Sequence, residues 1–114
     1  MAYAGLSLEG KLALVTGSAR GIGSALAIGL AQAGAAVAVS DIPDRLDGAK
    51  STQEKIESLG CQSGTYGLDV RDLGGIRAAI ERVVNDFGHL DVLVNNAGIR
   101  IPKPALEVTE EDWD

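Results

Sequence analysis

The sequence is poor in cysteine and in positive charge, and each shortage excludes a class of protein. Its 114 residues contain a single cysteine, Cys61, so an intrachain disulfide framework is excluded and a reducing compartment, the cytoplasm, is favoured. Ten Lys and Arg residues stand against sixteen Asp and Glu residues, for a net charge of −6. Without a basic stripe to displace counterions from phosphates, the chain is not expected to bind nucleic acid.

Signals for export, membrane insertion and metal binding are also missing. Residues 1–11 have no basic start followed by an apolar run, so no signal peptide is indicated. Residues 21–40 carry no charge over a length that could span a membrane, but Gly34 divides them into a helical pattern and a Val-rich strand pattern. The one histidine, His89, has no cluster of metal-ligating residues near it in the sequence, and we expect it in a surface turn.

Short apolar runs alternate with helical stripes along the chain, and each stripe ends at a glycine. The apolar runs predict strands at residues 11–16, 36–40, 62–68 and 90–95. The stripes predict helices at residues 22–33, 46–59 and 73–87, followed by Gly34, Gly60 and Gly88. The stripe of the first helix consists of Ile22, Leu26, Leu30 and Ala33. This alternation predicts an α/β fold, with parallel strands joined by right-handed crossovers and helices on both sheet faces.

Three glycines lie where the first strand turns into the first helix, in the segment V-T-G-S-A-R-G-I-G at residues 15–23. Gly17 permits a tight turn, Gly21 removes a side chain where the backbone would meet a ligand, and Gly23 lets the helix approach the sheet. The free N–H groups and the positive dipole end at the start of that helix would bind an anion such as a pyrophosphate. A phosphate-binding loop of the G-K-[ST] type is excluded, because that tripeptide is absent.

One acid, Asp41, ends the second predicted strand. In a doubly wound fold a carboxylate at this position binds the adenosine ribose of a dinucleotide; a solvated acid in the turn D-I-P-D is the alternative. Arg20 favours NADP instead, because a guanidinium there would bind the 2′-phosphate that distinguishes NADP from NAD. The repulsion between Asp41 and a phosphate, up to about 4 kcal/mol, exceeds the roughly 1 kcal/mol of an exposed arginine contact. The sequence therefore favours NAD over NADP.

Together with N-N-A-G at residues 95–98 and L-D-V at residues 68–70, the motif T-G-S-A-R-G-I-G resembles the short-chain dehydrogenase/reductase family. The resemblance implies a Rossmann-type doubly wound sheet of order 3-2-1-4, ending after the fourth strand. It also implies hydride transfer between a nicotinamide cofactor and an alcohol or carbonyl substrate. The implied cofactor-binding residues are Gly17, Ser18, Ala19, Arg20, Gly21, Ile22, Gly23, Asp41, Asp69, Val70, Asn96, Ala97 and Gly98. Asn95 is interpreted as a polar residue that stabilises the strand.

The family's catalytic serine and its Y-x-x-x-K motif would lie beyond N-N-A-G. Neither Tyr3 nor Tyr66 is followed by lysine four positions later, so no catalytic residue is assigned. We therefore interpret residues 1–114 as the N-terminal part of a single NAD(P)-binding domain, from an enzyme that would form a homo-oligomer. The outer edge of the fourth strand would then be unpaired, and the chain by itself should fold poorly or self-associate.

Two other functions stay open at this point. The chain could be a non-catalytic dinucleotide-binding module, which would bind NAD without turning over an alcohol. A methyltransferase that uses S-adenosylmethionine also has a glycine loop, but its first strand usually ends in an acid, whereas this one ends in Val15 and Thr16. The substrate cannot be read from these residues, and sugars, steroids, acyl thioesters and simple alcohols all remain candidates.

Overall fold

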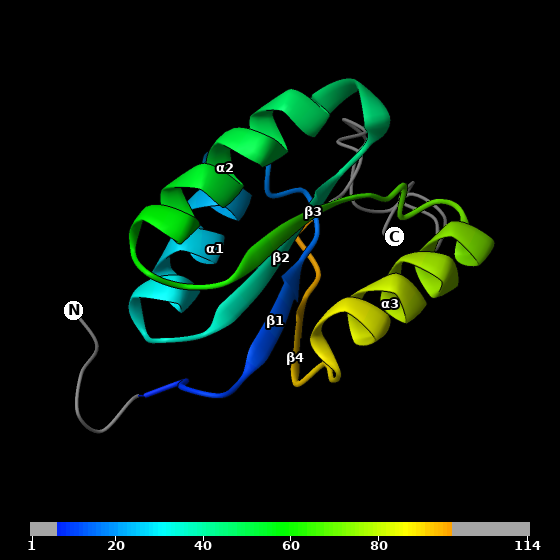
Figure 1. Cartoon of the computed structure of the whole chain (residues 1–114). Helices are drawn as coiled ribbons and strands as arrows, with labels where there is room; N and C mark the ends of the chain where they lie inside the picture. Colours follow the sequence, from blue (N-terminus) through cyan, green and yellow to red (C-terminus); the bar gives the residue numbers. More distant parts are fainter. Residues whose placement is uncertain (1–6, 97–114) are drawn as a thin grey trace, which may run out of the picture.

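A computed structural model describes residues 7–96 and shows a parallel sheet flanked by helices (Figure 1). The strands are β1 (Leu12–Val15), β2 (Ala36–Asp41), β3 (Ser63–Gly67) and β4 (Val92–Val94). The helices are α1 (Gly21–Gln32), α2 (Leu46–Ser58) and α3 (Leu73–Phe87), and a short 3-10 helix, η1, spans Pro43–Arg45. Every strand and helix expected from the sequence is present, with ends that differ by at most two residues, and η1 is an addition.

The sheet has the order β3-β2-β1-β4, as predicted, and all of its strand pairs are parallel. Leu12 pairs with Ala36 on one side of β1, and Ala13 pairs with Val92 on the other. In the described part of the chain, β4 pairs with β1 alone, so its outer edge has no strand beside it. The chain reverses its winding direction at β1, because β2 and β3 follow on one side and β4 on the other.

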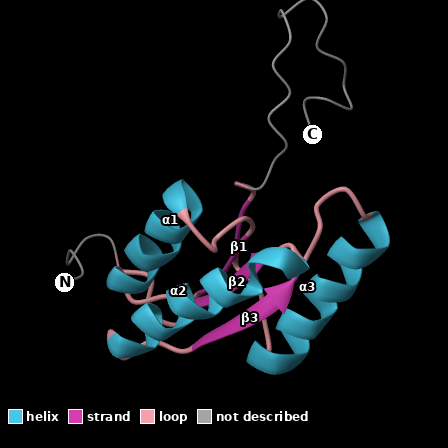
Figure 2. Cartoon of the chain, turned by 90° about the horizontal axis from the view of Figure 1, so that it is seen from above, coloured by secondary structure: helices cyan, strands magenta, loops and turns pink. Residues whose placement is uncertain are grey.

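Side chains alternate between the two faces of the sheet, as the period of a strand requires. Val15, Val37 and Val39 pack on the face that α1 and α2 cover. Leu12 and Leu14 pack on the other face, with Val83 of α3. Figure 2, which looks at the chain from above, shows α1 and α2 to one side of the strands and α3 to the other. The molecule therefore has three layers, with helices on both faces as the sequence predicts.

The buried face of α1 differs from the stripe expected from the sequence. Its buried residues are the small ones, Gly23, Ala27 and Ala31, whereas Ile22 is 73% exposed and Leu26 is 41% exposed. Small side chains spaced four residues apart let the axis of α1 lie close to the valines of the sheet. The hydrophobic stripe identified the helix correctly, and its Leu30 packs against the core, but Ile22 and Leu26 lie on the exposed side.

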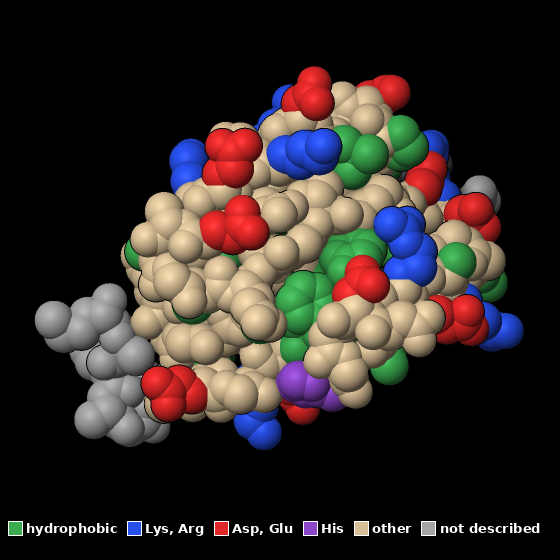
Figure 3. Space-filling model, viewed as in Figure 1, with side chains coloured by type: hydrophobic (Ala, Val, Ile, Leu, Met, Phe, Trp, Pro, Cys, Tyr) green, Lys and Arg blue, Asp and Glu red, His purple; other side chains and the backbone are tan. Residues whose placement is uncertain are grey.

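Charged side chains of both signs are mixed over the surface. On the face shown in Figure 3, Lys and Arg side chains lie among Asp and Glu side chains, with no large area of one sign. Among residues 7–96, no helix has both the length and the apolar character that crossing a membrane would require.

Candidate functional site

The glycine loop after β1 lies beside the end of β4, at the point where the strand order reverses. The backbone N–H of Asn96 donates to Thr16 Oγ1 at 2.9 Å, and Asn96 Nδ2 donates to the carbonyl oxygen of Gly17 at 3.3 Å. Thr16 Oγ1 lies 3.3 Å from the carbonyl oxygen of Val94 and 3.4 Å from Asn95 Oδ1, which fits the interpretation of Asn95 as a residue that stabilises the strand. In open α/β sheets, ligands bind outside the carboxyl ends of the strands at this reversal point.

Two of the three loop glycines have backbone angles that other residues avoid, and the third leaves no room for a side chain. Gly17 has φ of +64° and Gly21 has φ of +60°. A Cβ on Gly23 would lie 2.0 Å from the carbonyl oxygen of Gly17 and 2.6 Å from Asn96 Nδ2. Gly23 is therefore needed where α1 meets the loop, whereas the sequence predicted a close approach to the sheet. Beside Gly21 nothing lies within 4 Å of a Cβ position, which leaves that backbone open.

The start of α1 has the features of an anion-binding site. Arg20, its N-cap, is extended and makes no side-chain capping hydrogen bond, and the first turn of the helix contains no acid. As at any helix start, the N–H groups of Gly21, Ile22 and Gly23 have no intrahelical acceptor. These donors and the positive end of the helix dipole suit a pyrophosphate, so the residues present fit the phosphates of a dinucleotide.

Ser18 is fully buried and shapes the loop from inside. Its hydroxyl lies 3.0 Å from the carbonyl oxygen of Val15 and accepts the backbone N–H of Ser40 at 2.9 Å. Its own backbone N–H donates to the carbonyl oxygen of Ser40 at 2.9 Å. The polar groups of Ser18 are thus directed into the protein, where they fasten the glycine loop to the end of β2.

Asp41 is only 5% exposed, and its carboxylate holds the loop as well. Oδ2 accepts the backbone N–H of Ala19 at 3.1 Å, and Oδ1 accepts the N–H of Ile42 at 2.8 Å. The alternative of a solvated acid in a turn is therefore wrong. Each carboxylate oxygen has a second lone pair, so these bonds leave Asp41 acceptor positions for the hydroxyls of a ribose.

Asp69 and Val70, the residues expected near an adenine, follow β3 at the same edge of the sheet. Arg71 engages both carboxylate oxygens of Asp69: Nε donates to Oδ1 at 3.0 Å and Nη2 to Oδ2 at 2.8 Å. The side-chain hydrogen bonds of Arg71, together with its backbone N–H at 3.0 Å, lower the pKa of Asp69 to about 2. Val70 is half-buried. Ala97 and Gly98 lie outside the described residues.

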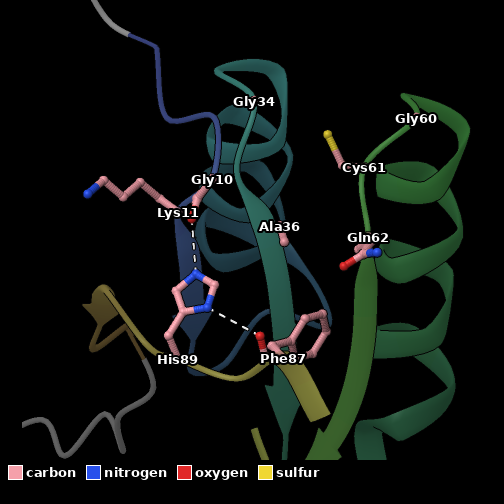
Figure 4. Close-up of a pocket in the computed structure, with 9 residues that line it drawn as sticks. All are labelled: Gly10, Lys11, Gly34, Ala36, Gly60, Cys61, Gln62, Phe87 and His89. Atoms are coloured by element: carbon pink, nitrogen blue, oxygen red, sulfur yellow. Dashed lines mark hydrogen bonds between the residues drawn. The ribbon is translucent and has the colours of Figure 1, made fainter. Parts of the chain in front are cut away.

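A hollow of about 260 Å³ lies at the amino-terminal ends of the strands, opposite the glycine loop, next to Lys11, Cys61 and His89. Figure 4 shows Cys61 on one side of it and His89 on the other. His89 Nε2 lies 3.0 Å from the carbonyl oxygen of Gly10, and Nδ1 lies 3.2 Å from that of Phe87. His89 is exposed, as predicted, in the connection between α3 and β4. The carboxyl ends of α1, α2 and α3 all lie at this end of the sheet. The negative ends of the three helix dipoles therefore face the hollow, which does not suit a phosphate.

Sequence patterns did not identify the buried hydroxyl groups that support the glycine loop. Besides Ser18 and Ser40, Thr52 of α2 donates its hydroxyl to the carbonyl oxygen of Ser18 at 2.9 Å. The available signal was weak: a threonine on the inner face of a helix, in register with Ala49 and Ile56. Within the part of the chain that the structure describes, no group of three or more metal-ligating side chains comes together.

Comparisons with known proteins agree with this geometry. A family model described as short chain dehydrogenase matches residues 11–114. Over 114 residues the chain is 42% identical to the 2-dehydro-3-deoxy-D-gluconate 5-dehydrogenase of Escherichia coli (strain K12), covering all of this chain and 44% of that protein. It is 45% identical over 102 residues to the L-2,3-butanediol dehydrogenase of Corynebacterium glutamicum, covering 90% of this chain and 40% of that one.

Solved structures give the same picture. A short chain dehydrogenase from Burkholderia cenocepacia J2315, solved in complex with NADP, has a TM-score of 0.80 and 42% identity to this chain. The match covers 92% of this chain and 42% of that one. The chain thus spans less than half the length of each of these relatives.

Proposed function

The chain belongs to the short-chain dehydrogenase family, and from that membership we propose that it forms the cofactor-binding part of an oxidoreductase. The proposed reaction transfers a hydride between a nicotinamide dinucleotide and an alcohol or carbonyl group. Residues 1–114 would be the N-terminal part of one NAD(P)-binding domain. The named relatives support this reading, since both act as dehydrogenases of hydroxyl-bearing compounds by name.

One observation carries the proposal: the glycine loop and Asp41 are bonded to each other at the reversal point of the sheet. The loop presents the free N–H groups of Gly21, Ile22 and Gly23 at the positive end of α1, which would hold the pyrophosphate. Asp41 lies 3.1 Å from the N–H of Ala19 in that loop, where it would accept bonds from the adenosine ribose. When bound, the nicotinamide ring would supply or accept the hydride.

We propose NAD as the preferred cofactor, because a 2′-phosphate would bring its charge against the buried carboxylate of Asp41. That repulsion reaches about 4 kcal/mol for charges about 4 Å apart at an effective dielectric near 20. Two observations favour NADP instead: the Burkholderia relative was solved with NADP, and Arg20 is exposed at the start of α1. An exposed ion pair contributes only about 1 kcal/mol, so the effect of Asp41 should dominate.

If the chain is part of such an oxidoreductase, the residue that donates the proton to the substrate lies outside residues 7–96. Tyr66, the tyrosine within that range, is 4% exposed and donates its hydroxyl to Asp86 Oδ2 at 2.6 Å. Burial, with the hydrogen bond and charge of Asp86, raises the pKa of Tyr66 above its ordinary value, which is the opposite of what proton transfer near neutral pH requires. We assign the catalytic serine, tyrosine and lysine to the remainder of the enzyme.

Fluorescence titration with NADH and with NADPH tests the proposal, combined with an assay of alcohol oxidation by the complete protein that carries this sequence. Saturable binding with NADH tighter than NADPH, together with turnover, supports the full proposal. Binding without turnover of any alcohol supports the non-catalytic module instead. Equal or tighter binding of NADPH would overturn the argument from Asp41, and binding of neither would overturn the dinucleotide site.

Three further properties are part of the proposal. The substrate would be a small alcohol or carbonyl compound, for which sugar acids and diols are the precedents among the relatives. The enzyme would be cytoplasmic, which fits the free thiol of Cys61. The complete enzyme would be a homo-oligomer, which light scattering measures directly.

A further inference from the structure

The peptide group between Ser18 and Ala19 is held at both ends by side chains from elsewhere in the fold. Its carbonyl oxygen accepts the hydroxyl of Thr52 at 2.9 Å, and its N–H donates to Asp41 Oδ2 at 3.1 Å. A peptide group is planar, so fixing both its oxygen and its hydrogen fixes its orientation. This peptide lies in the middle of the glycine loop, two residues before the open N–H groups of α1.

Thr52 is 2% exposed and its hydroxyl joins three parts of the chain. Besides the Ser18 carbonyl oxygen, its Oγ1 lies 3.0 Å from Ser24 Oγ on α1 and 3.3 Å from the carbonyl oxygen of Gly48 on its own helix. A hydroxyl has one proton and two acceptor positions. The shorter carbonyl contact indicates that Thr52 donates to Ser18 and accepts from Ser24.

The backbone of α2 also touches the loop directly. A Cβ on Gly48 would lie 3.1 Å from the carbonyl oxygen of Ala19 and 3.2 Å from its Cβ. The helix that carries Thr52 therefore packs against the loop without an intervening side chain. This close approach places the hydroxyl of Thr52, one turn further along α2, within reach of the Ser18 carbonyl.

We propose that Thr52 is a positioning residue for the dinucleotide, acting through the orientation of the Ser18–Ala19 peptide. The proposal rests on the proposed function, because it supposes that the N–H groups at the start of α1 bind the pyrophosphate. With the Thr52 hydroxyl in place, the loop is already in its binding shape before the cofactor arrives. Without it, Asp41 alone holds the peptide, through the N–H of Ala19, and cofactor binding must include fixing the orientation of its carbonyl end.

Thr52→Val tests this in the complete protein that carries this sequence, because valine keeps the shape of threonine and removes the hydroxyl. NADH binding, measured by fluorescence titration, should weaken about tenfold, which corresponds to roughly 1.4 kcal/mol. Thr52→Ser keeps the hydroxyl and should remain within about threefold of the unchanged protein. If Thr52→Val binds NADH as well as the unchanged protein does, the proposal fails.

Thr65→Val is the matched control for a general loss of stability. Thr65 lies on β3 and its hydroxyl donates to Gln53 Oε1 on α2 at 2.5 Å, so the same chemical change removes a hydrogen bond to the same helix away from the loop. It should lower the melting temperature without weakening NADH binding. If Thr65→Val weakens binding as much as Thr52→Val does, the effect comes from stability and the positioning role is overturned.

Amide hydrogen exchange separates this inference from the proposed function. In the protein without cofactor, Thr52→Val should speed exchange of the Ala19 N–H, and Thr65→Val should not. If the unchanged protein binds neither NADH nor NADPH, the proposed function fails and the assignment of Thr52 to a dinucleotide site fails with it. If the unchanged protein binds NADH but Thr52→Val leaves both the exchange rate and the binding unaltered, only the role of Thr52 is overturned.

Discussion

The carboxylate of Asp41 accepts a hydrogen bond from the backbone N–H of Ala19 at 3.1 Å, across 22 residues of chain. One oxygen of a nearly buried acid therefore helps to fix the glycine loop, while the same side chain is placed where a ribose would bind. The shape of the phosphate loop and the recognition of the ribose thus depend on one residue. A substitution at Asp41 should alter both affinity and cofactor preference.

Asp41→Asn should weaken NADH binding and reduce the preference for NADH over NADPH. The amide has nearly the size of the carboxylate, but its NH₂ group would face the N–H of either Ala19 or Ile42, both of which now donate to carboxylate oxygens. Losing the negative charge removes the repulsion of a 2′-phosphate. We expect the ratio of the NADPH and NADH dissociation constants to fall about tenfold or more, measured by fluorescence titration of both cofactors.

Asp44→Asn is the matched control, because Asp44 is an exposed acid three residues later, in η1. It removes the same charge without touching the loop. The ratio of dissociation constants should stay where it is in the unchanged protein. A shift as large as that of Asp41→Asn would show that net charge alone sets the preference and that contact with Asp41 does not.

Gly23→Ala should disrupt the loop, whereas Gly29→Ala in the same helix should not. A Cβ at Gly23 would lie 2.0 Å from the carbonyl oxygen of Gly17, while at Gly29 nothing lies within 4 Å. We expect Gly23→Ala to destabilise the fold by about 1–3 kcal/mol, as for other overpacked sites, and to abolish NADH binding. Gly29→Ala should stabilise the fold by up to about 1 kcal/mol, because alanine favours the helix. Chemical denaturation measures both, and equal effects would contradict the close contact.

The ends of the helices could be predicted from the sequence because each depends on one local residue. Gly34, Gly60 and Gly88 all have positive φ, the left-handed conformation in which a helix commonly ends and which glycine adopts without strain. Parallel pairing followed from the alternation of short apolar runs with helices, whereas the strand order followed from the resemblance to the short-chain dehydrogenase/reductase family. The glycine signals lie within a few residues of the helix ends that they predict.

The buried face of α1 and the bonds of Asp41 could not be predicted in this way. A hydrophobic stripe favours Ile22 and Leu26 for the core, but the close approach of α1 to the sheet selects Ala27 and Ala31 instead. The contact of Asp41 with Ala19 joins residues that the chain brings together only when β1 and β2 pair. Such features depend on packing between elements, which no local pattern records.

Arg71→Gln should raise the pKa of Asp69 from about 2 toward its ordinary value of 3.8. The side chain of Arg71 is the main cause of the low value, and the backbone N–H of residue 71 remains in the variant, so the return should be partial. Since the folded pKa is depressed, the pair contributes stability above about pH 4 and loses it as the pH falls toward 2. A pH titration of the Asp69 carboxyl by NMR measures this.

Arg82→Gln provides the comparison for that titration. Arg82 stacks over the ring of Tyr66, with its guanidinium carbon 5.2 Å from the ring centre, and does not contact Asp69. The pKa of Asp69 should therefore stay near 2 in this variant. If Arg71→Gln leaves the pKa of Asp69 unchanged, the contact between the two side chains does not persist in solution.

Leu93→Lys should reduce self-association of the 114-residue chain. Leu93 is 54% exposed in β4, the strand whose outer edge has no neighbour among residues 7–96, and an apolar strand edge of this kind pairs readily with another chain. A lysine on the edge opposes that pairing through charge.

Leu59→Lys is the control, because Leu59 is 47% exposed at the end of α2 and away from β4. Light scattering at increasing concentration should show that the unchanged chain and Leu59→Lys associate, whereas Leu93→Lys associates less. A monodisperse unchanged chain that unfolds cooperatively would contradict the prediction, and would mean that the edge of β4 is covered within this chain.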